Sequence, residues 1–464
     1  MNVSVRRAGT MLLALILVAA VTLLGSTSVS HAQSTCTKLS TVNMMNLANT
    51  PNTIVINSYT EDGPVGSPLQ DTLEANATKV YFDIPGGPGF QGSVVVSAAQ
   101  GLAAIANISC VGFSAGGSYI ALSSGAPSVK LPLLFSNNST FYTTFSVQNT
   151  GSNDADVTVE YSDGTSQPAA TIKSNSAKVY DQRNEQHNQA IFAGKATSTN
   201  GEPIVAAALQ ENEGSSIIFA YTGFSSEGSL FPVFPLVNTN NSDYTTGIQI
   251  QNSGSVATDV TVSYVPSQAG TACTETQTIQ PGASNTFALA VFVAGDLTGI
   301  TSDCTQGEKF IGAASVETNS ASQNLVGLVN QFNPVKSVGE AYSGFAVEDA
   351  TSELLMPLLM DRNSDYWTSF NIQNVGSAST EVTCKVFNSS DASGNPVVDY
   401  EVSQNLAPGE ALTNLQFGQI APGYIGSGTC TAADANGKIV GVVNQLDSTN
   451  RSGDQLYTYE AISR

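Results

Sequence analysis

The amino-acid sequence predicts an all-β protein: four tandem antiparallel β-sandwich domains that follow an N-terminal signal peptide. Three observations lead to this prediction. One sequence pattern recurs along the chain at a period of about a hundred residues. Short runs of Val, Thr and Tyr alternate with Gly, Pro, Asn and Asp, as is typical of strands joined by turns. The first thirty residues have the composition of a segment that directs export.

The repeated pattern is an apolar-Pro-Leu start, an Asn/Ser/Asp loop, an aromatic-Thr run and a closing Gln-Asn-x-Gly-Ser. It occurs three times in clear form, as LPLLFSNNSTFYTTFSVQNTGS (131–152), FPLVNTNNSDYTTGIQIQNSGS (234–255) and LMPLLMDRNSDYWTSFNIQNVGS (355–377). A fainter copy, Met-Asn-Leu-Ala-Asn, lies near residue 46. With the Asn of each copy as a ruler, the marks fall at Asn46, Asn149, Asn252 and Asn374, so successive copies are 103, 103 and 122 residues apart. Each step is about the size of one β-sandwich.

The ruler places the units at 33–128 (divergent), 129–229, 230–352 and 353–464, after a signal peptide at 1–32. Within each unit the same landmarks follow in order. A Val/Thr/Tyr strand such as 156–161 comes first, then a turn, and then a Phe/Tyr-x-Gly step at Phe90, Phe192, Phe310 or Tyr424. A Gly/Ala-rich apolar strand and a strand containing Tyr119, Tyr221, Tyr342 or Tyr457 close the unit. The recurring Gly of the Phe/Tyr-x-Gly step predicts a bulge or a crowded backbone position.

The N-terminal segment carries Arg6 and Arg7, an apolar run from Met11 to Leu24, and small residues up to Ala32. This three-part pattern predicts a secretory signal peptide cleaved after Ala32. The alternative, a retained membrane anchor, is disfavoured because the apolar run is shorter than the ~20 residues that span a bilayer. We therefore expect an exported mature chain, secreted or at the cell surface, with no insertion of the mature chain in a membrane.

The chain is acidic, with 37 Asp+Glu against 16 Lys+Arg and a formal net charge of −21. Such a charge opposes phosphate backbones, so nucleic acid is not an expected partner. Charged residues make up only 11% of the chain, and polar uncharged residues are abundant. We expect a surface composed mainly of hydroxyl and amide side chains.

Two cysteines fall in the first unit, two in the third and two in the fourth, and none falls in the second. This count predicts one disulfide within each of the three units, Cys36–Cys110, Cys273–Cys304 and Cys384–Cys430, in an oxidising compartment. No pair has the C-x₂-C spacing of a zinc site, so no metal site is expected from the cysteines.

The residues give little support to catalysis. Gly112-Phe-Ser-Ala-Gly116 has the form of a nucleophile elbow around Ser114, but the following residues predict a turn and a strand instead of the helix that an elbow needs. His187 would be the only base, and its polar neighbours predict a solvated loop histidine. Acidic residues such as Glu211 and Glu213 are scattered, and they do not predict a glycosidase pair. We therefore expect no catalytic residue and no enzymatic activity, with a serine hydrolase using Ser114 as a remote alternative.

The loop Asp361-Arg-Asn-Ser-Asp-Tyr-Trp367, with the only tryptophan of the chain, is the best binding candidate. Asp361, Asn363, Asp365, Tyr366 and Trp367 combine side-chain oxygens with aromatic rings, which could hold Ca²⁺ or a sugar. The spacing matches no defined calcium loop, so no cofactor is predicted. The competing interpretation is structural, with Asn and Asp side chains that cap a turn and the aromatic rings at the sheet edge.

Taken together, the four units resemble the tandem immunoglobulin-like or fibronectin-like β-sandwich repeats of secreted bacterial proteins. The resemblance implies an immunoglobulin-like fold and a structural or adhesive function at the cell surface, with an extracellular protein or glycan as partner. An extracellular carbohydrate-binding protein is the alternative. The resemblance implies no catalytic residue, and because it rests on the fold it does not identify a site.

Overall fold

The computed structural model describes residues 36–82, 84–87, 90–110, 115–213, 216–225, 227–320, 322–391, 393, 395–449 and 453–464. Within these residues almost all regular structure is antiparallel β-strand; the exceptions are a four-residue helix, α1 (Leu289–Phe292), and a 3₁₀ turn, η2 (Val347–Asp349). The prediction of an all-β fold is confirmed. The division into immunoglobulin-like domains stays a prediction, and we use "repeats 1 to 4" for the four sequence units.

The strands of each repeat form two sheets of their own. We call the two sheets inner and outer, the inner one being the sheet that holds the strand ending at the ruler Asn.

In repeat 1 the inner sheet has the order β4 (Thr78–Tyr81), β1 (Lys38–Asn46), β6 (Leu102–Cys110), β7 (Gly116–Ile120), and the outer sheet the order β3 (Gly63–Leu73), β2 (Asn52–Thr60), β5 (Ser93–Ala98).

In repeat 2 the inner sheet has the order β12 (Ala177–Asp181), β9 (Phe141–Asn149), β14 (Ile204–Asn212), β15 (Ile218–Thr222), and the outer sheet the order β11 (Ser166–Ile172), β10 (Ala155–Tyr161), β13 (Ile191–Ser198), β8 (Ser128–Phe135).

In repeat 3 the inner sheet has the order β20 (Ser284–Phe287), β17 (Thr245–Asn252), β23 (Leu325–Asn333), β24 (Val338–Ser343), and the outer sheet the order β21 (Thr301–Ser302), β19 (Cys273–Ile279), β18 (Thr258–Ala269), β22 (Phe310–Thr318), β16 (Pro232–Thr239), β25 (Phe345–Ala346).

In repeat 4 the inner sheet has the order β30 (Ala411–Leu415), β27 (Tyr366–Asn374), β32 (Ile439–Asp447), β33 (Tyr457–Glu460), and the outer sheet the order β29 (Pro396–Leu406), β28 (Thr380–Ser390), β31 (Tyr424–Ala432), β26 (Glu353–Asp361), β34 (Ile462–Ser463).

The ruler asparagine has the same structural role in every repeat. Asn149 is fully buried at the end of β9; its Nδ2 donates to the carbonyls of Asn153 and Ile172, and its Oδ1 accepts from the N–H of Gly151. Asn46, Asn252 and Asn374 make the same three kinds of hydrogen bond. In each, Nδ2 donates to the carbonyl of residue i+4 and to a carbonyl at a strand end 27–32 residues later, and Oδ1 accepts from the N–H of residue i+2. A buried amide that satisfies three backbone groups explains why this position recurs, because unpaired backbone groups are costly.

The Pro-Leu start of repeats 2, 3 and 4 acts together with a tyrosine of the last long strand of the same repeat, which in repeat 4 is Tyr459. The strand register shifts at this segment in β16 and β26, and the leucine carbonyl accepts a hydrogen bond from a buried tyrosine of the last long strand. The pairs are Tyr221–Leu133 at 2.7 Å, Tyr342–Leu236 at 2.6 Å and Tyr459–Leu358 at 2.5 Å. Each tyrosine thereby ties the inner sheet to the outer sheet of its own repeat.

The Gly of the Phe/Tyr-x-Gly step is crowded, as expected. A Cβ on Gly312 would lie 2.1 Å from the carbonyl oxygen of Val265, and one on Gly92 would lie 2.0 Å from that of Tyr59. Only glycine lets the neighbouring strand approach so closely.

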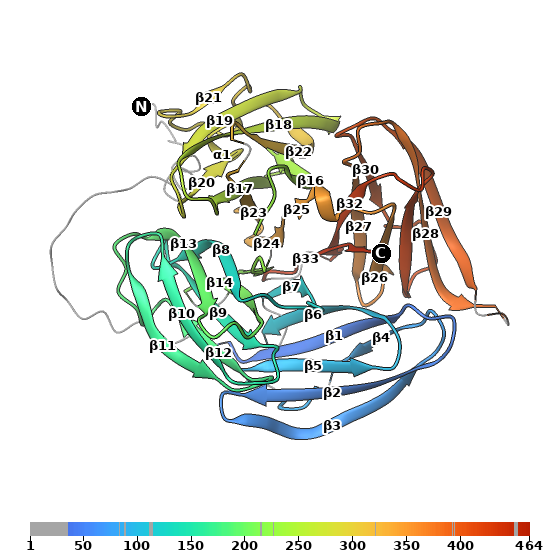
Figure 1. Cartoon of the computed structure of the whole chain (residues 1–464). Coiled ribbons are helices and arrows are strands. Elements are labelled where there is room, and N and C mark those ends of the chain that lie inside the picture. The colour runs from blue at the N-terminus through green and yellow to red at the C-terminus, as the bar shows by residue number, and fades with distance from the viewer. Residues whose placement is uncertain are drawn as a thin grey trace, which may run out of the picture.

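The four repeats form a closed ring (Figure 1). The strands β7, β15, β24 and β33, one from the edge of each inner sheet, meet at its centre, where β7 packs against β15 and β33, and β24 packs against the same two strands. We call these four strands the hub. The hydrophobic clusters also cross repeat boundaries: Leu328 and Ala341 of repeat 3 belong to the cluster of repeat 2, and Ile105 of repeat 1 to that of repeat 4.

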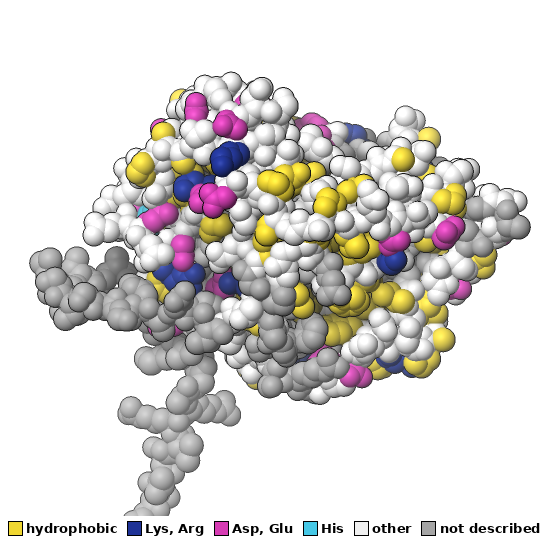
Figure 2. Space-filling model, turned by 90° about the horizontal axis from the view of Figure 1, so that it is seen from below, with side chains coloured by type: hydrophobic (Ala, Val, Ile, Leu, Met, Phe, Trp, Pro, Cys, Tyr) yellow, Lys and Arg dark blue, Asp and Glu magenta, His cyan; other side chains and the backbone are white. Residues whose placement is uncertain are grey.

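The surface agrees with the composition. Figure 2 shows a face on which the backbone and uncharged, non-hydrophobic side chains dominate, acidic and basic side chains are scattered, and hydrophobic side chains gather toward one side.

Candidate functional site

The loop that the sequence singles out, 361–367, forms a tight turn between β26 and β27. Asn363 and Tyr366 exchange two backbone hydrogen bonds of 2.9 Å, and Arg362, Ser364 and Asp365 have positive φ angles. The loops of repeats 2 and 3 have the same pattern, with backbone exchange between Asn138 and Phe141 and between Asn241 and Tyr244. Asn, Asp and Ser tolerate or stabilise such turns, which accounts for this composition in structural terms.

The five candidate residues differ in their surroundings, from the buried Asp361 to the exposed Asp365. Asp361 is fully buried, and its carboxylate accepts hydrogen bonds from Arg362 Nε (2.7 Å) and from the N–H groups of Gly418 (3.0 Å) and Ile420 (2.7 Å). Burial alone would raise the pKa of Asp361, but these hydrogen bonds outweigh it and lower the pKa. Asp361 therefore anchors the segment before β31.

The aromatic part of the loop is more open. Trp367 is half-buried, and its ring meets that of Phe417 edge to face at 5.8 Å. Phe417 is 50% exposed, and the Arg362 guanidinium lies 5.6 Å from its ring centre. Tyr366, also half-buried, donates to Gln455, while Asp365 is exposed. Sequence reasoning missed Phe417, because it follows β30 and lies far from the loop along the chain. Ligand binding by this surface stays a prediction.

The hub contains three buried carboxylic acids that the sequence analysis did not single out. Glu340 of β24 accepts hydrogen bonds from the N–H groups of Ala220 (2.8 Å) in repeat 2, Ala341 (2.8 Å) in its own strand and Ser118 (3.1 Å) in repeat 1. A single side chain therefore connects three of the four hub strands. Edge strands leave backbone groups unpaired, and in the hub a carboxyl group satisfies them.

The other two acids come from repeat 4. Asp454 accepts from the N–H groups of Ile218 and Gly339, each at 3.0 Å, and Glu460 accepts from the N–H of Ser343. These bonds connect repeat 4 to repeats 2 and 3, and the hydroxyls of Ser109 and Tyr457, 2.9 Å apart, connect it to repeat 1.

Burial dominates the electrostatics of the hub. Glu340, Asp454 and Glu460 are 1%, 0% and 4% exposed, and among the described residues none of them forms a salt bridge with Lys or Arg. Loss of hydration raises the pKa of each, against the opposing effect of the N–H donors, and the nearby Asp454 raises the pKa of Glu340 further. Closed off from solvent, these acids can hold strands together but cannot meet a substrate.

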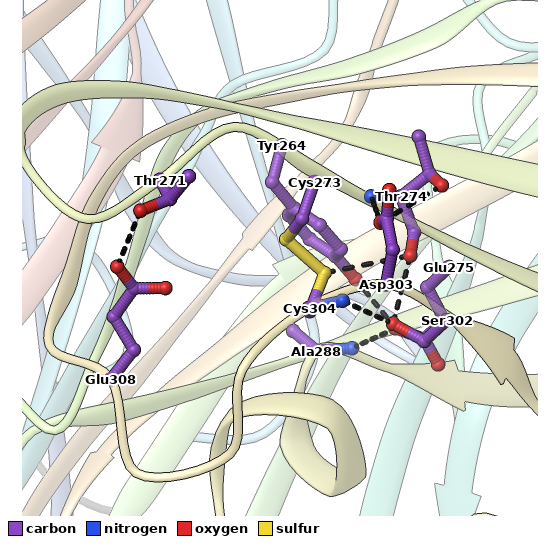
Figure 3. The surroundings of a disulfide bond; sticks show 10 residues. All are labelled: Tyr264, Thr271, Cys273, Thr274, Glu275, Ala288, Ser302, Asp303, Cys304 and Glu308. Carbon is purple, nitrogen blue, oxygen red and sulfur yellow. Dashed lines mark hydrogen bonds between the residues drawn. A yellow bond between two sulfur atoms is a disulfide. The ribbon is translucent and has the colours of Figure 1, made fainter.

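The three disulfides of the structure are those that the sequence analysis predicts: Cys36–Cys110, Cys273–Cys304 and Cys384–Cys430. Figure 3 shows the second of these, which ties the start of β19 to the long loop that leads to β22. Asp303 beside it accepts a hydrogen bond from the N–H of Thr274 at 2.5 Å. Asp303 and the two sulfurs lie close enough together to suggest metal ligation. Because both sulfurs are in the disulfide, neither is a thiolate ligand.

The loop between β20 and β22 is also held at its start, Ala288, by a buried acid (Figure 3). Glu275 accepts from the Tyr264 hydroxyl at 2.7 Å and from the N–H of Ala288 at 2.8 Å. Burial raises the pKa of Glu275, and these hydrogen bonds oppose the shift. The loop is therefore anchored by a covalent bond and by a carboxyl group.

The side chain of His187 is buried, so the expectation of a solvated loop histidine is wrong. This side chain is 1% exposed, Nδ1 lies 3.1 Å from Asp163, and the ring stacks on Phe192 with 4.1 Å between centres. Tyr161 meets it edge to face at 4.9 Å. Repeat 3 has the same aromatic triad built from Tyr264, Phe292 and Phe310. His187 thus takes the place of Phe292, and its polar neighbours in the sequence concealed a core position.

Ser114 and the neighbouring residues 111–113 lie outside the described residues, so the hydrolase alternative stays a hypothesis. Among the helices of the described chain, none has the length and apolarity needed to cross a bilayer.

Comparisons with known proteins give no family. No family model matches the chain, and no curated protein matches it. Among solved structures the chain is similar to an α-L-rhamnosidase from Streptomyces avermitilis complexed with L-rhamnose, at 7% identity and a TM-score of 0.14 over 90% of this chain. It is also similar to the native conformation of E. coli α-2-macroglobulin, at 11% identity and a TM-score of 0.12 over 92% of this chain. The chain spans 55% and 29% of the lengths of these proteins, and at such TM-scores neither likeness carries an argument.

Proposed function

We propose that the mature chain is a non-catalytic protein of the cell exterior, with a structural or adhesive role and with four immunoglobulin-like domains as its building units. The observation that carries this proposal is the hub. Its buried acids accept hydrogen bonds from backbone N–H groups of neighbouring repeats, so these acids hold the repeats together. A closed ring of this kind keeps surface loops in fixed relative positions, which suits a scaffold that presents them to a protein or glycan partner.

Three disulfides support the location, because such bonds persist in oxidising compartments and are rare in the cytosol. The acidic, hydroxyl-rich composition also suits a chain exposed to the medium.

Cell fractionation of the native protein tests the proposal. We expect the protein in the medium, or on the cell exterior where a membrane-impermeant biotin reagent labels its lysines, with no free thiol. Recovery from the cytoplasm with reduced cysteines would contradict it. Labelling of Ser114 by a fluorophosphonate probe, lost in Ser114→Ala, would restore the hydrolase hypothesis instead.

A second candidate function, carbohydrate binding, is favoured by one observation, the exposed ring of Phe417 beside Trp367 and Arg362. Aromatic faces next to a charged donor are a common means of binding a sugar ring. Trp367 is the only tryptophan, so its fluorescence reports this surface directly during titration with a glycan panel or with Ca²⁺.

A saturable change that Phe417→Ala or Asp365→Ala abolishes would establish binding there. The control is Val335→Ala, which changes an exposed side chain (72% exposed) in repeat 3. No change with any ligand would leave the structural interpretation of the loop, in which the turn and the Asp361 anchor account for its residues.

A further inference from the structure

Within the described residues, the outer sheet of repeat 1 lacks the first strand that the other three repeats have. Each of repeats 2, 3 and 4 begins with a strand, β8, β16 or β26, that pairs with the strand at the Phe/Tyr-x-Gly step, β13, β22 or β31. In repeat 1 the strand after this step is β5, and its described partner is β2 alone. One edge of β5 is therefore open at the position that β8, β16 and β26 fill in the other repeats.

The position of the predicted cleavage site accounts for this open edge. β8 begins 21 residues and ends 14 residues before the ruler Asn149, so the same count from Asn46 gives residues 25–32. These residues belong to the predicted signal peptide, and cleavage after Ala32 removes them, so this step rests on the proposed export. Residues 33–35 then precede Cys36, and three residues are too few for a strand of eight.

The open edge leaves repeat 1 less covered than its neighbour. In repeat 2, β8 packs over β14, and Ile204 and Ala208 of β14 are fully buried. Their register counterparts on β6, Leu102 and Ala106, are only half-buried. Residues 94–96 of β5, all valine, are half-buried as well. Apolar surface thus reaches the solvent along β5 and β6.

Tyr119 shows which hydrogen bond is missing. It pairs with Ala106 across β6 and β7, as Tyr221 pairs with Ala208 across β14 and β15. The Tyr221 hydroxyl donates to the carbonyl of Leu133 in β8. The hydroxyl of Tyr119 has no hydrogen-bond partner among the described residues. Tyr119 is half-buried, and its hydroxyl is not among the unpartnered atoms that are closed off from solvent, so a bound chain can reach it.

We propose that the open edge of β5 binds an extended segment of a partner protein with the pattern apolar-Pro-Leu-apolar, whose leucine carbonyl accepts the hydroxyl proton of Tyr119. Addition of a strand to an open sheet edge is a common mode of peptide recognition, in which main-chain hydrogen bonds give affinity and alternate side chains give specificity. β8, β16 and β26 show which pattern this fold accepts at that edge. A second copy of the chain does not supply it, because these three segments are bound within their own repeats.

The test is a fluorescence anisotropy titration of a labelled peptide with the sequence of β8, SVKLPLLF, with the mature protein, residues 33–464. We expect saturable binding, and about tenfold weaker binding to Tyr119→Phe, which removes one hydrogen bond. Tyr342→Phe is the matched control, because it changes the same register position in repeat 3, where β16 fills the edge. This variant should bind the peptide as the unaltered protein does.

Two further versions of the peptide separate strand pairing from apolar adsorption. One is N-methylated on the amides of one edge and the other on those of the opposite edge, so both keep every side chain. Only the version whose free N–H groups face β5 should bind. If Tyr119→Phe does not fold, this pair still decides, since equal binding of the two versions would refute strand addition.

Absence of saturable binding would also overturn the proposal, as would equal affinity of Tyr119→Phe and the unaltered protein. If the mature protein alone sediments as a dimer that the peptide dissociates, then a second copy covers the edge. If a peptide of residues 25–32 binds more tightly than the β8 peptide, the segment of the chain itself is the occupant, and either result would refute a partner protein. Mass spectrometry of the native protein tests the removal of residues 1–32 separately, so a failure of export is distinguishable from a failure of strand binding.

Discussion

Glu340 offers a direct test of what sets the stability of the hub. Two effects compete at this side chain: burial disfavours the carboxylate, and three N–H donors favour it. The net effect raises the pKa of Glu340 well above its ordinary value of 4.5. The folded state then keeps a proton that the unfolded state has already lost, so the free energy of unfolding should fall as the pH rises above about 4.5.

Glu340→Gln isolates this contribution, because glutamine is a neutral isostere of the protonated acid. At pH 4 we expect the variant to match the unaltered protein within about 1 kcal/mol. As the pH rises, the variant should become relatively more stable, at a rate of at most about 1.4 kcal/mol per pH unit, which is the limit for one titrating group. Glu340→Ala leaves three N–H groups without an acceptor and should cost about 3 kcal/mol or more at pH 4, and this cost should shrink as the pH rises because the variant has no acid to titrate.

Urea unfolding followed by circular dichroism between pH 4 and 8 measures these differences, and hydrogen exchange at the amides of Ser118 and Ala220 localises them to the hub. Glu317→Gln, an exposed position on β22, is the control and should show neither effect. If the unaltered protein instead gains stability relative to Glu340→Gln as the pH rises, then the N–H donors outweigh burial, and Glu340 is held in the hub as a carboxylate.

Three further outcomes are expected. Asn149→Ala should cost about 2–4 kcal/mol of unfolding free energy in repeat 2, since it leaves three buried backbone groups unpaired, whereas Asn188→Ala in an exposed loop should cost less; equal costs would contradict the role of the ruler. The double variant Cys273→Ala/Cys304→Ala, which opens a loop of 31 residues, should lose about 4 kcal/mol, and denaturation with and without the bridge measures this. His187→Phe, which installs the residue found in repeat 3, should fold with a thermal midpoint within about 5 °C of the parent; failure to fold would show that the bond to Asp163 is required.

The sequence predicts the parts of this fold that recur in three or all four repeats. The ruler asparagines and the Pro-Leu start each satisfy a local set of hydrogen bonds, and the crowded glycine allows a close approach of the neighbouring strand. The same residues therefore recur wherever the same local structure does. The cysteine pairs follow from a count, because repeats 1, 3 and 4 each contain two cysteines and repeat 2 contains none.

The hub could not be found in this manner. Glu340 of repeat 3 corresponds in register to Phe219 and Tyr457, and Glu460 corresponds to Thr222 and Ser343. Each acid thus occurs in one repeat only, at a position where the others have different residues. A comparison between repeats brings out the residues that they share and hides a residue that occurs in one repeat only. The contacts between repeats nevertheless depend on such residues.

The position of β33 in the hub has a consequence for how the chain acquires its shape during synthesis. Repeats 1, 2 and 3 precede residues 454–460, yet β15 and β24 depend on Asp454 and Glu460 for hydrogen-bond acceptors, and β7 and β24 depend on β33 for packing. While the chain emerges from its N-terminus, β7, β15 and β24 therefore have edges that still lack a partner, and such edges are prone to pairing with other chains. Ring closure becomes available only once the last strands have emerged, so we expect assembly of this protein to be most vulnerable to wrong pairing just before residues 454–460 are synthesised.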